Sequence, residues 1–418
     1  MKPLIEYITA DDVRFSLANT PQITFEVTDA CNLKCTYCGY GEFYTDYDMR
    51  KSIMLSTKKA FSLLDYMNKL WSSSQNISYN RNIYISFYGG EPLMNFDFIQ
   101  KVVDYVENMH CPTRLFSFSM TTNALLLHRY MDFLVEHKFH TLISLDGDRE
   151  ETGYRIDKNG KPAFDRIVKN VDLLRSVYPD YFDEYVNFNS VLHNKNTVES
   201  IFRFFKAKYN KMPRIGELNN MGIHKDKIEE FEKTYRNSRE SLDQSEHYTE
   251  IIKNMQFQLG TYQSLGTYIM QYSEFVYKDY NELLYGKPKL ENRIPTGTCM
   301  PFGKKIYMTV NGKLLPCERI GHQFSLGTIR DQKIEIDPEA IAYKYNSYYA
   351  KLDDQCRKCH KRRVCTQCIF NLQDIEKRPI CQGYMNQREF DIYKKAQLNF
   401  LASNPEEYSH IMEDIVVI

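Results

Sequence analysis

The chain has 418 residues, 43% of them hydrophobic, and its 54 Lys and Arg side chains are balanced by 54 Asp and Glu side chains. A chain of this length buries a large core and forms two domains, or one barrel with an appendage. Zero net charge without blocks of like charge argues against a nucleic-acid partner, and no uncharged run is long enough to span a membrane. We therefore expect a cytoplasmic protein that acts on a small molecule or on another protein.

Short apolar segments rich in β-branched residues alternate with longer amphipathic segments over residues 22–215. Strands and helices that alternate at this spacing predict parallel βα units. Six such units predict an α/β fold built on a partial (β/α)6 TIM-like barrel, not the full eightfold form. The predicted strands are 23–28, 82–88, 115–122, 141–145, 185–192 and 214–220, and the predicted helices are 57–70, 96–109, 125–137, 164–177 and 197–209.

The last part of the chain has a different pattern. Residues 221–285 are charged and tyrosine-rich with helical periodicity, which predicts bridging helices. Residues 304–317 predict a β-hairpin with a type I′ turn at Asn311-Gly312, because both central residues of that turn need positive φ. A closing helix is predicted over 387–402. The predicted domains are 1–215 for the barrel, 216–298 for the helical bridge, 299–388 for a small cysteine-rich domain and 389–418 for a C-terminal helix and tail.

The 11 cysteines are unevenly distributed along the chain. In a reducing compartment structural disulfides are improbable, so that cysteines in clusters favour metal binding or catalysis. Cys111 stands alone in "HCPT" and is predicted to be an ordinary thiol. The other ten are Cys31, Cys35 and Cys38 near the start, and Cys299, Cys317, Cys356, Cys359, Cys365, Cys368 and Cys381 in the last third.

Short distinctive motifs follow the first four predicted strands. In parallel βα architecture, reactive groups collect on the loops after the carboxyl ends of the strands. Each motif is a weak signal by itself, but four in order indicate one functional face. They are "CNLKCTYC" at 31–38, "YGGEP" at 88–92, "TTN" at 121–123 and "SLDG" at 144–147.

The first motif carries three cysteines within eight residues. A [4Fe–4S] cluster held by only three thiolates keeps one iron free for a ligand from outside the protein. Structural zinc needs four protein ligands, and neither a histidine nor a fourth cysteine lies near 31–38. The spacing therefore favours an iron–sulfur cluster over zinc or unligated thiols.

Together these motifs resemble the radical SAM superfamily over about residues 20–220. The resemblance implies that the free iron binds the amino and carboxylate groups of S-adenosylmethionine (SAM). An electron from the cluster would then split SAM into methionine and a 5′-deoxyadenosyl radical. The protein would supply position and a dry pocket.

The same resemblance assigns cofactor-binding residues. Tyr37 would flank the adenine, and the backbone of Gly89, Gly90 and Glu91 would bind the SAM ammonium. Ser144 and Arg155 would reach the ribose and the carboxylate, the latter because a guanidinium fork matches two oxygens. The "TTN" motif adds Asn123 as a cofactor-binding candidate.

Asp146, in "SLDG", is interpreted as a turn former that holds its loop and not as a catalytic base, because Asp-Gly is a common turn pair. No catalytic residue is assigned from the sequence.

The seven late cysteines resemble the SPASM extension of radical SAM enzymes over about residues 299–385, which implies two auxiliary [4Fe–4S] clusters and three clusters in total. The predicted hairpin supports this, since its turn brings Cys317 back alongside the segment that starts at Cys299. A zinc ribbon fits less well, because only five residues separate its two C-x-x-C pairs. By resemblance the second auxiliary cluster would use Cys356, Cys359, Cys365 and Cys381, and the first would use Cys299, Cys317 and Cys368.

The first auxiliary cluster would thus have three cysteines. Either one of its irons is open to a substrate thiolate or a water, or a side chain not recognised in the sequence fills the fourth place.

Proteins with this combination of domains suggest a radical SAM peptide maturase that modifies a ribosomally made precursor peptide and forms a thioether or carbon–carbon crosslink. Its partners would be the precursor peptide and a reducing electron donor such as flavodoxin or ferredoxin. An alternative is an anaerobic sulfatase-maturing enzyme that makes formylglycine. An alternative of another class, a non-catalytic iron–sulfur electron-transfer protein, leaves the motifs at the strand ends without a role.

Overall fold

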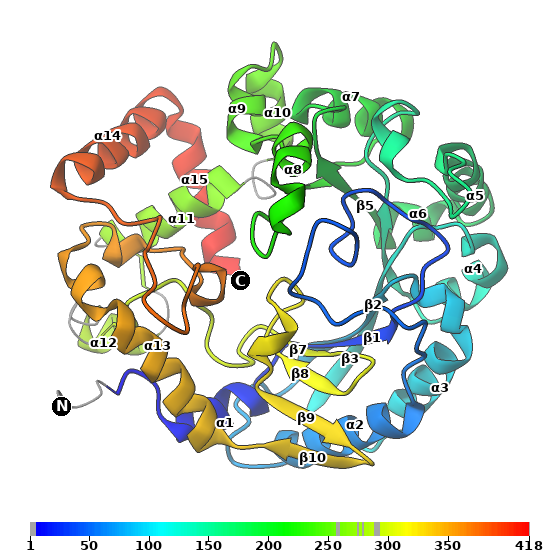
Figure 1. Ribbon diagram of the computed structural model, residues 1–418, viewed down its shortest axis with the longest axis horizontal. Helices are drawn as coiled ribbons and strands as arrows, with labels where there is room; N and C mark the ends of the chain where they lie inside the picture. The colour runs from blue at the N-terminus through cyan, green and yellow to red at the C-terminus, as the bar shows by residue number, and fades with distance from the viewer. Residues whose placement is uncertain (1–5, 256–259, 274–275, 278–279, 288–292, 418) are drawn as a thin grey trace. The chain divides into compact units, whose positions relative to one another are not determined.

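The computed structural model describes residues 6–255, 260–273, 276–277, 280–287 and 293–417, and the chain folds into two compact units (Figure 1). The barrel unit contains residues 11–254 and 300–338, and the cysteine unit contains the described parts of 1–10, 255–299 and 339–418. Residues 300–338, which include the predicted hairpin, join the sheet of the barrel unit.

One ten-stranded sheet forms the barrel unit, in the order β10-β9-β8-β7-β1-β2-β3-β4-β5-β6. Strands β1 to β6 pair in parallel with their sequence neighbours, and helices lie outside them (Figure 1). The predicted partial (β/α)6 barrel is therefore confirmed. Its strands are β1 Gln22–Thr28, β2 Arg81–Gly89, β3 Arg114–Thr122, β4 His140–Ser144, β5 Val186–Leu192 and β6 Arg214–Glu217, and its helices include α1 Ala10–Ala18, α2 Thr57–Trp71, α3 Phe96–Glu107, α4 Leu127–Glu136, α5 Phe164–Val177, α6 Pro179–Tyr185 and α7 Val198–Tyr209.

The other side of β1 carries four more strands that the predicted barrel lacked. β7 pairs in parallel with β1, opposing Ile306 to Ile23, and β8, β9 and β10 continue the sheet as antiparallel neighbours. With a partner on each side, β1 is buried along six of its seven residues, as is typical of a central parallel strand. The added strands are β7 Ile306–Met308, β8 Lys313–Leu315, β9 Gly327–Arg330 and β10 Lys333–Ile336.

The predicted hairpin is present as β7 and β8, but its turn is not type I′. Gly312 has φ of 83° and Asn311 is not among the residues with positive φ, which a type I′ turn would require at both positions. Gly312 N donates to Thr309 O (2.8 Å) and Thr309 N donates to Lys313 O (2.9 Å). This is a three-residue loop that ends in a left-handed glycine, where a Cβ would lie 2.4 Å from Ile329 O.

The cysteine unit is helical in its described part. Its longest helix, α13, buries Tyr345 and Tyr349, and Asn346 on the same helix accepts hydrogen bonds from the backbone of Tyr7 (3.0 Å) and Ile8 (3.1 Å). The predicted bridging and closing helices are present where the chain is described. The remaining helices are α8 Ile228–Thr234, α9 Ser238–Asp243, α10 Tyr248–Met255, α11 Gly260–Tyr272, α12 Tyr280–Tyr285, α13 Pro338–Lys358, α14 Gln387–Ser403 and α15 Pro405–Val417.

Across the described residues, every helix is too short or too polar to cross a lipid bilayer.

Candidate functional site

The loop after β1 carries the first three cysteines, and backbone hydrogen bonds fix it to a distant segment. Lys34 N donates to Ile156 O (2.7 Å), and Thr36 N donates to Tyr154 O (3.3 Å). Burial raises the pKa of Cys31 to about 11 and that of Cys35 to about 12, and the nearby Cys38 thiol adds to both shifts. The three predicted ligands therefore lie partly buried in one loop.

Three N–H groups point at sulfur atoms of this loop. Leu33 N (3.4 Å) and Asn123 Nδ2 (3.7 Å) donate to Cys31 Sγ, and Arg50 Nη2 donates to Cys38 Sγ (3.3 Å). Three soft thiol donors surrounded by N–H groups suit an iron–sulfur cluster, because hydrogen bonds to sulfur stabilise its negative charge. The residues present thus fit the group that the sequence predicts.

The "GGE" turn at the end of β2 packs directly on the loop after β1. Gly90 N donates to Thr28 O (2.8 Å), and Glu91 N donates to Ala30 O (2.9 Å). A Cβ at Gly90 would lie 2.0 Å from Ala30 O, so that only glycine permits this approach. The ammonium of SAM donates hydrogen bonds, so only the carbonyl oxygens of this turn could bind it. This role of the turn stays a prediction.

The Glu91 carboxylate is fully buried and links β2 to the end of β3. Its oxygens accept hydrogen bonds from Thr122 Oγ1 (2.7 Å), Asn123 N (2.8 Å) and Leu93 N (3.2 Å). Burial raises the pKa of Glu91 to about 7 in spite of these three donors. The side chain therefore holds the Asn123 backbone in place while the Asn123 amide contacts Cys31.

Replacing Glu91 by glutamine is expected to lower the free energy of unfolding by about 1–3 kcal/mol, because the new amide would face the Asn123 N–H without accepting it. The wild type should also lose up to about 3 kcal/mol of stability as the pH rises from about 4.5 to 7, because in this range Glu91 keeps its proton in the folded state and releases it in the unfolded state. Urea midpoints of cluster-free protein at pH 5 and 7.5 measure both effects. A pH dependence of equal size in the Glu91→Gln variant would contradict the assignment to Glu91.

Asp146 is not a turn former, and this corrects the interpretation from the sequence. It is completely buried and pairs with Arg155 through two hydrogen bonds of 2.8 and 3.0 Å. It also accepts from Val191 N (2.9 Å) and from the Tyr37 hydroxyl. Burial alone would raise the pKa of Asp146, but the charge of Arg155, the nearby His193 ring (Nε2 at 3.8 Å) and the hydrogen bonds from Arg155 lower it to about 2.

This ion pair determines where two predicted SAM-binding residues lie. Arg155 is 6% exposed with its guanidinium on Asp146, and the Tyr37 ring stacks on His193 with centroids 5.6 Å apart. Ser144 is the half-buried last residue of β4. The roles of these residues towards SAM remain predictions.

The sequence analysis also missed Glu26, which lies in the middle of β1 and is 1% exposed. A charged residue inside "ITFEVT" was the available signal. For Arg50, beyond the cysteine loop, the sequence offered none.

A second group of thiols lies in the cysteine unit. Cys356, Cys359, Cys365 and Cys381 line one pocket, together with Arg362, Gln355 and Tyr384 among others. Burial raises the pKa of Cys356 to about 12, and the other three thiols add to the shift. Four converging thiols fit the donor set predicted for the second auxiliary cluster.

The cysteines predicted for the first auxiliary cluster divide between the units. Cys299 and Cys368 belong to the cysteine unit, where each influences the ionisation of Tyr349. Cys317 follows β8 in the barrel unit and accepts a hydrogen bond from Arg319 N (3.3 Å). This set of three stays a prediction. Cys111 precedes β3 and thus lies at the opposite end of that strand from Asn123, as an ordinary thiol would.

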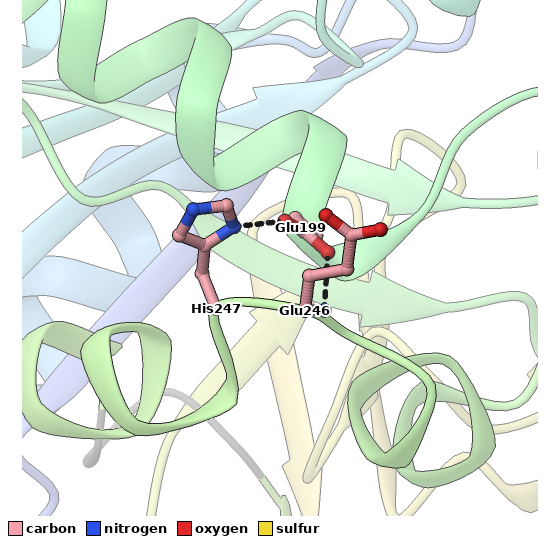
Figure 2. A group of neighbouring side chains, drawn as sticks. All are labelled: Glu199, Glu246 and His247. Carbon is pink, nitrogen blue, oxygen red and sulfur yellow. Dashed lines mark hydrogen bonds and ion pairs between the residues drawn. The ribbon is translucent and has the colours of Figure 1, made fainter.

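One further group of ligand-type side chains lies outside these sites (Figure 2). The Glu199 carboxylate on α7 forms a hydrogen bond with His247 Nδ1 (2.5 Å) and accepts another from Glu246 N (2.9 Å). The side chains of Glu246 and His247 are exposed. These hydrogen bonds hold the loop before α10 against α7. They account for the closeness of the three side chains, so that no metal ion is needed to explain it.

Comparison with known proteins gives matches over the barrel and over the whole chain. Residues 25–207 match the Radical SAM superfamily. The cysteine-type anaerobic sulfatase-maturating enzyme of Clostridium novyi is 31% identical over 191 residues, which are 43% of this chain and 46% of that protein. The chain thus spans about half the length of this relative.

Two matches extend over nearly the full length. The cysteine-type anaerobic sulfatase-maturating enzyme of Clostridium perfringens (strain ATCC 13124) is 24% identical over 90% of this chain and 96% of that protein. The solved structure of native anSMEcpe with bound AdoMet and Cp18Cys peptide has a TM-score of 0.58 at 17% identity, over 94% of this chain and 99% of that one. At that identity the structural match shows a common fold.

Proposed function

We propose that this protein, which carries a radical SAM domain homologous to that of anaerobic sulfatase-maturating enzymes, is an enzyme that cleaves SAM reductively and modifies a side chain of a peptide or protein. The observation that carries the proposal is the packing of the Cys31–Cys38 loop against the "GGE" turn, with Asn123 bonded to both. An enzyme with free cysteines and iron–sulfur ligands works in the reducing cytoplasm.

The proposed cofactors are SAM and three [4Fe–4S] clusters. Cys31, Cys35 and Cys38 would hold the SAM-binding cluster, and the pocket of four thiols would hold the second auxiliary cluster. When bound, the first cluster and SAM supply a 5′-deoxyadenosyl radical that removes a hydrogen atom from the substrate. An external donor such as flavodoxin or ferredoxin would supply the electron.

The chain's own residues would position these groups and exclude water. Glu91 fixes Asn123 against the cysteine loop, and Arg155 fixes Tyr37 through Asp146. Both carboxylates are 0% exposed. Such a preformed, dry site limits side reactions of a radical.

Our first candidate reaction is the formation of a thioether or carbon–carbon crosslink in a ribosomally made precursor peptide. It is supported by the predicted first auxiliary cluster, whose three cysteines would leave one iron for a substrate thiolate. Closing a crosslink also releases an electron, for which auxiliary clusters are suitable carriers.

The second candidate is the conversion of a peptidyl cysteine or serine to formylglycine. It is favoured by the match to the Clostridium perfringens sulfatase-maturating enzyme over 96% of that protein. Treating the peptides with a hydrazide before mass spectrometry separates the candidates, because only the aldehyde of formylglycine reacts. The mass loss alone does not separate them, since a crosslink and the conversion of serine to formylglycine each remove two hydrogens.

The test of the proposal is SAM cleavage. Protein purified and reconstituted without oxygen should form 5′-deoxyadenosine from SAM under dithionite. The Cys31→Ala, Cys35→Ala, Cys38→Ala triple variant should form less than about one thousandth as much, because the electron donor to SAM is then missing.

The matched control is Cys111→Ala, which removes a thiol outside both cysteine groups and should retain wild-type cleavage. If fully reconstituted wild-type protein forms no 5′-deoxyadenosine with candidate peptides present, the proposal is overturned in favour of an electron carrier.

A further inference from the structure

Arg50 is a cation directed at the first cysteine loop, and no motif of the sequence indicates a role for it. Its Nη2 donates to Cys38 Sγ over 3.3 Å, and its guanidinium carbon lies 4.4 Å from the centre of the Tyr40 ring. Among the described residues no carboxylate forms an ion pair with Arg50, and its buried Nε has no hydrogen-bond partner there. The guanidinium of Arg50 therefore interacts with a sulfur atom and with the face of an aromatic ring.

The Tyr40 ring that supports Arg50 is itself fixed. Tyr40 donates from its hydroxyl to Glu26 Oε1 (2.5 Å) and lies 2.8 Å from the Tyr307 hydroxyl. Glu26 is 1% exposed, and its other oxygen accepts from Val310 N (2.8 Å). Burying a carboxylate without a cation is destabilising, and hydrogen bonds offset only part of that effect. The bonds that Glu26 accepts hold Tyr40 in one orientation.

The backbone on the other side of Arg50 is fixed as well. Lys51 N and Ile53 N donate to the Asp29 carboxylate at 2.8 and 2.6 Å. Asp29 is 4% exposed and precedes Cys31 by two residues. Arg50 is thus held at its backbone by the start of the cysteine loop and at its side chain by Tyr40.

We propose that Arg50 is a positioning residue that raises the reduction potential of the cluster bound by Cys31, Cys35 and Cys38. The inference rests on the proposed function, because it needs that cluster. A charged N–H donor at a ligating sulfur stabilises the electron that the cluster gains, and a half-buried charge is only weakly screened. The consequence is a cluster that milder donors can reduce.

The test is an anaerobic redox titration followed by electron paramagnetic resonance, using the signal that changes when SAM is added. At a fixed potential near the wild-type midpoint, Arg50→Met should lower the ratio of reduced to oxidised cluster by about tenfold, which is 59 mV for a one-electron couple. Arg50→Lys keeps the positive charge and should lower the ratio of reduced to oxidised cluster by less than about threefold. If Arg50→Met does not assemble the cluster, Arg50→Gln, which loses only the charge and part of the fork, should show a drop of about fivefold or more.

The matched control is Lys34→Met. Lys34 lies inside the cysteine loop, but it is 69% exposed and pairs with Glu42 at 3.1 Å, so that its loss should change the ratio by less than about twofold.

Two results would overturn the inference and are distinguishable. If wild-type protein cleaves SAM but Arg50→Met or Arg50→Gln titrates like Lys34→Met, the inference fails while the proposed function stands. If wild-type protein shows neither a SAM-responsive signal nor 5′-deoxyadenosine, the proposed function fails and the inference fails with it.

Discussion

Replacing Arg155 by methionine is expected to lower the free energy of unfolding by about 3–5 kcal/mol, one of the largest effects of any single change in the barrel. The substitution leaves Asp146, which is 0% exposed, without its cation, although Val191 N and the Tyr37 hydroxyl still donate to it. An uncompensated buried charge is far more destabilising than a lost contact. Urea denaturation of cluster-free protein measures the loss.

The chain contains a matched control for this variant. Arg149 and Asp165 also form a pair with two hydrogen bonds, but their side chains are 64% and 61% exposed. Arg149→Met should therefore change stability by less than about 1 kcal/mol. The double variant Asp146→Asn, Arg155→Met should recover part of the loss, because asparagine is neutral and still accepts from Val191 N. Equal effects of the two single Arg variants would show that burial of the pair is not what matters.

Replacing Gly90 by alanine is expected to reduce formation of 5′-deoxyadenosine by about 100-fold or more. The added Cβ would lie 2.0 Å from Ala30 O and 2.5 Å from its carbonyl carbon, and both are backbone atoms that no side-chain rotation can move. The "GGE" turn or the cysteine loop must shift by about an ångström, and displacements of that size in a positioned site lower rates by about two orders of magnitude. The assay is anaerobic SAM cleavage with iron content measured in parallel.

A glycine of the same barrel without such crowding provides the control. A Cβ at Gly216 in β6 would meet only the end of the Arg319 side chain, at 3.9 Å, so that Gly216→Ala should keep the folded structure and its stability. If Gly90→Ala retains wild-type cleavage and iron content, the close packing of the two loops is not required for the reaction.

The barrel could be predicted from the sequence because its signals are local. Each strand from β1 to β6 is a short apolar run, and each following helix repeats apolar residues on one face, as Leu63, Leu64, Met67 and Trp71 do in α2. The pocket of Cys356, Cys359, Cys365 and Cys381 could be anticipated for a similar reason, since three of these cysteines lie at short spacings. The observed strand bounds differ from the predicted ones by a few residues at most.

The features that were missed depend on partners far away in the sequence. Nothing near Asp146 indicates that the Tyr37 hydroxyl, 109 residues earlier, and Val191 N, 45 residues later, donate to it, and an Asp-Gly pair favours a turn on local grounds. The turn at Asn311-Gly312 was assigned to the wrong type because its surroundings are not local. Its flanking strands also pair with β1 and β9, and Gly312 O accepts a hydrogen bond from Ile329 N (2.7 Å). The pairing of β7 with β1 is also non-local, and the short β7 carries no sign of it.

That pairing has a consequence for how the chain is made. β1 leaves the ribosome well before one of its two neighbours, because Ile306 in β7 follows its partner Ile23 by 283 residues. Until then β1 presents an apolar edge beside the loop of Cys31, Cys35 and Cys38, and such edges are sites of aggregation. A fragment that ends at residue 298 would lack β7 and keep that edge unpaired, so strands β1 to β6 and the β7–β8 hairpin of the same unit must be produced as one piece.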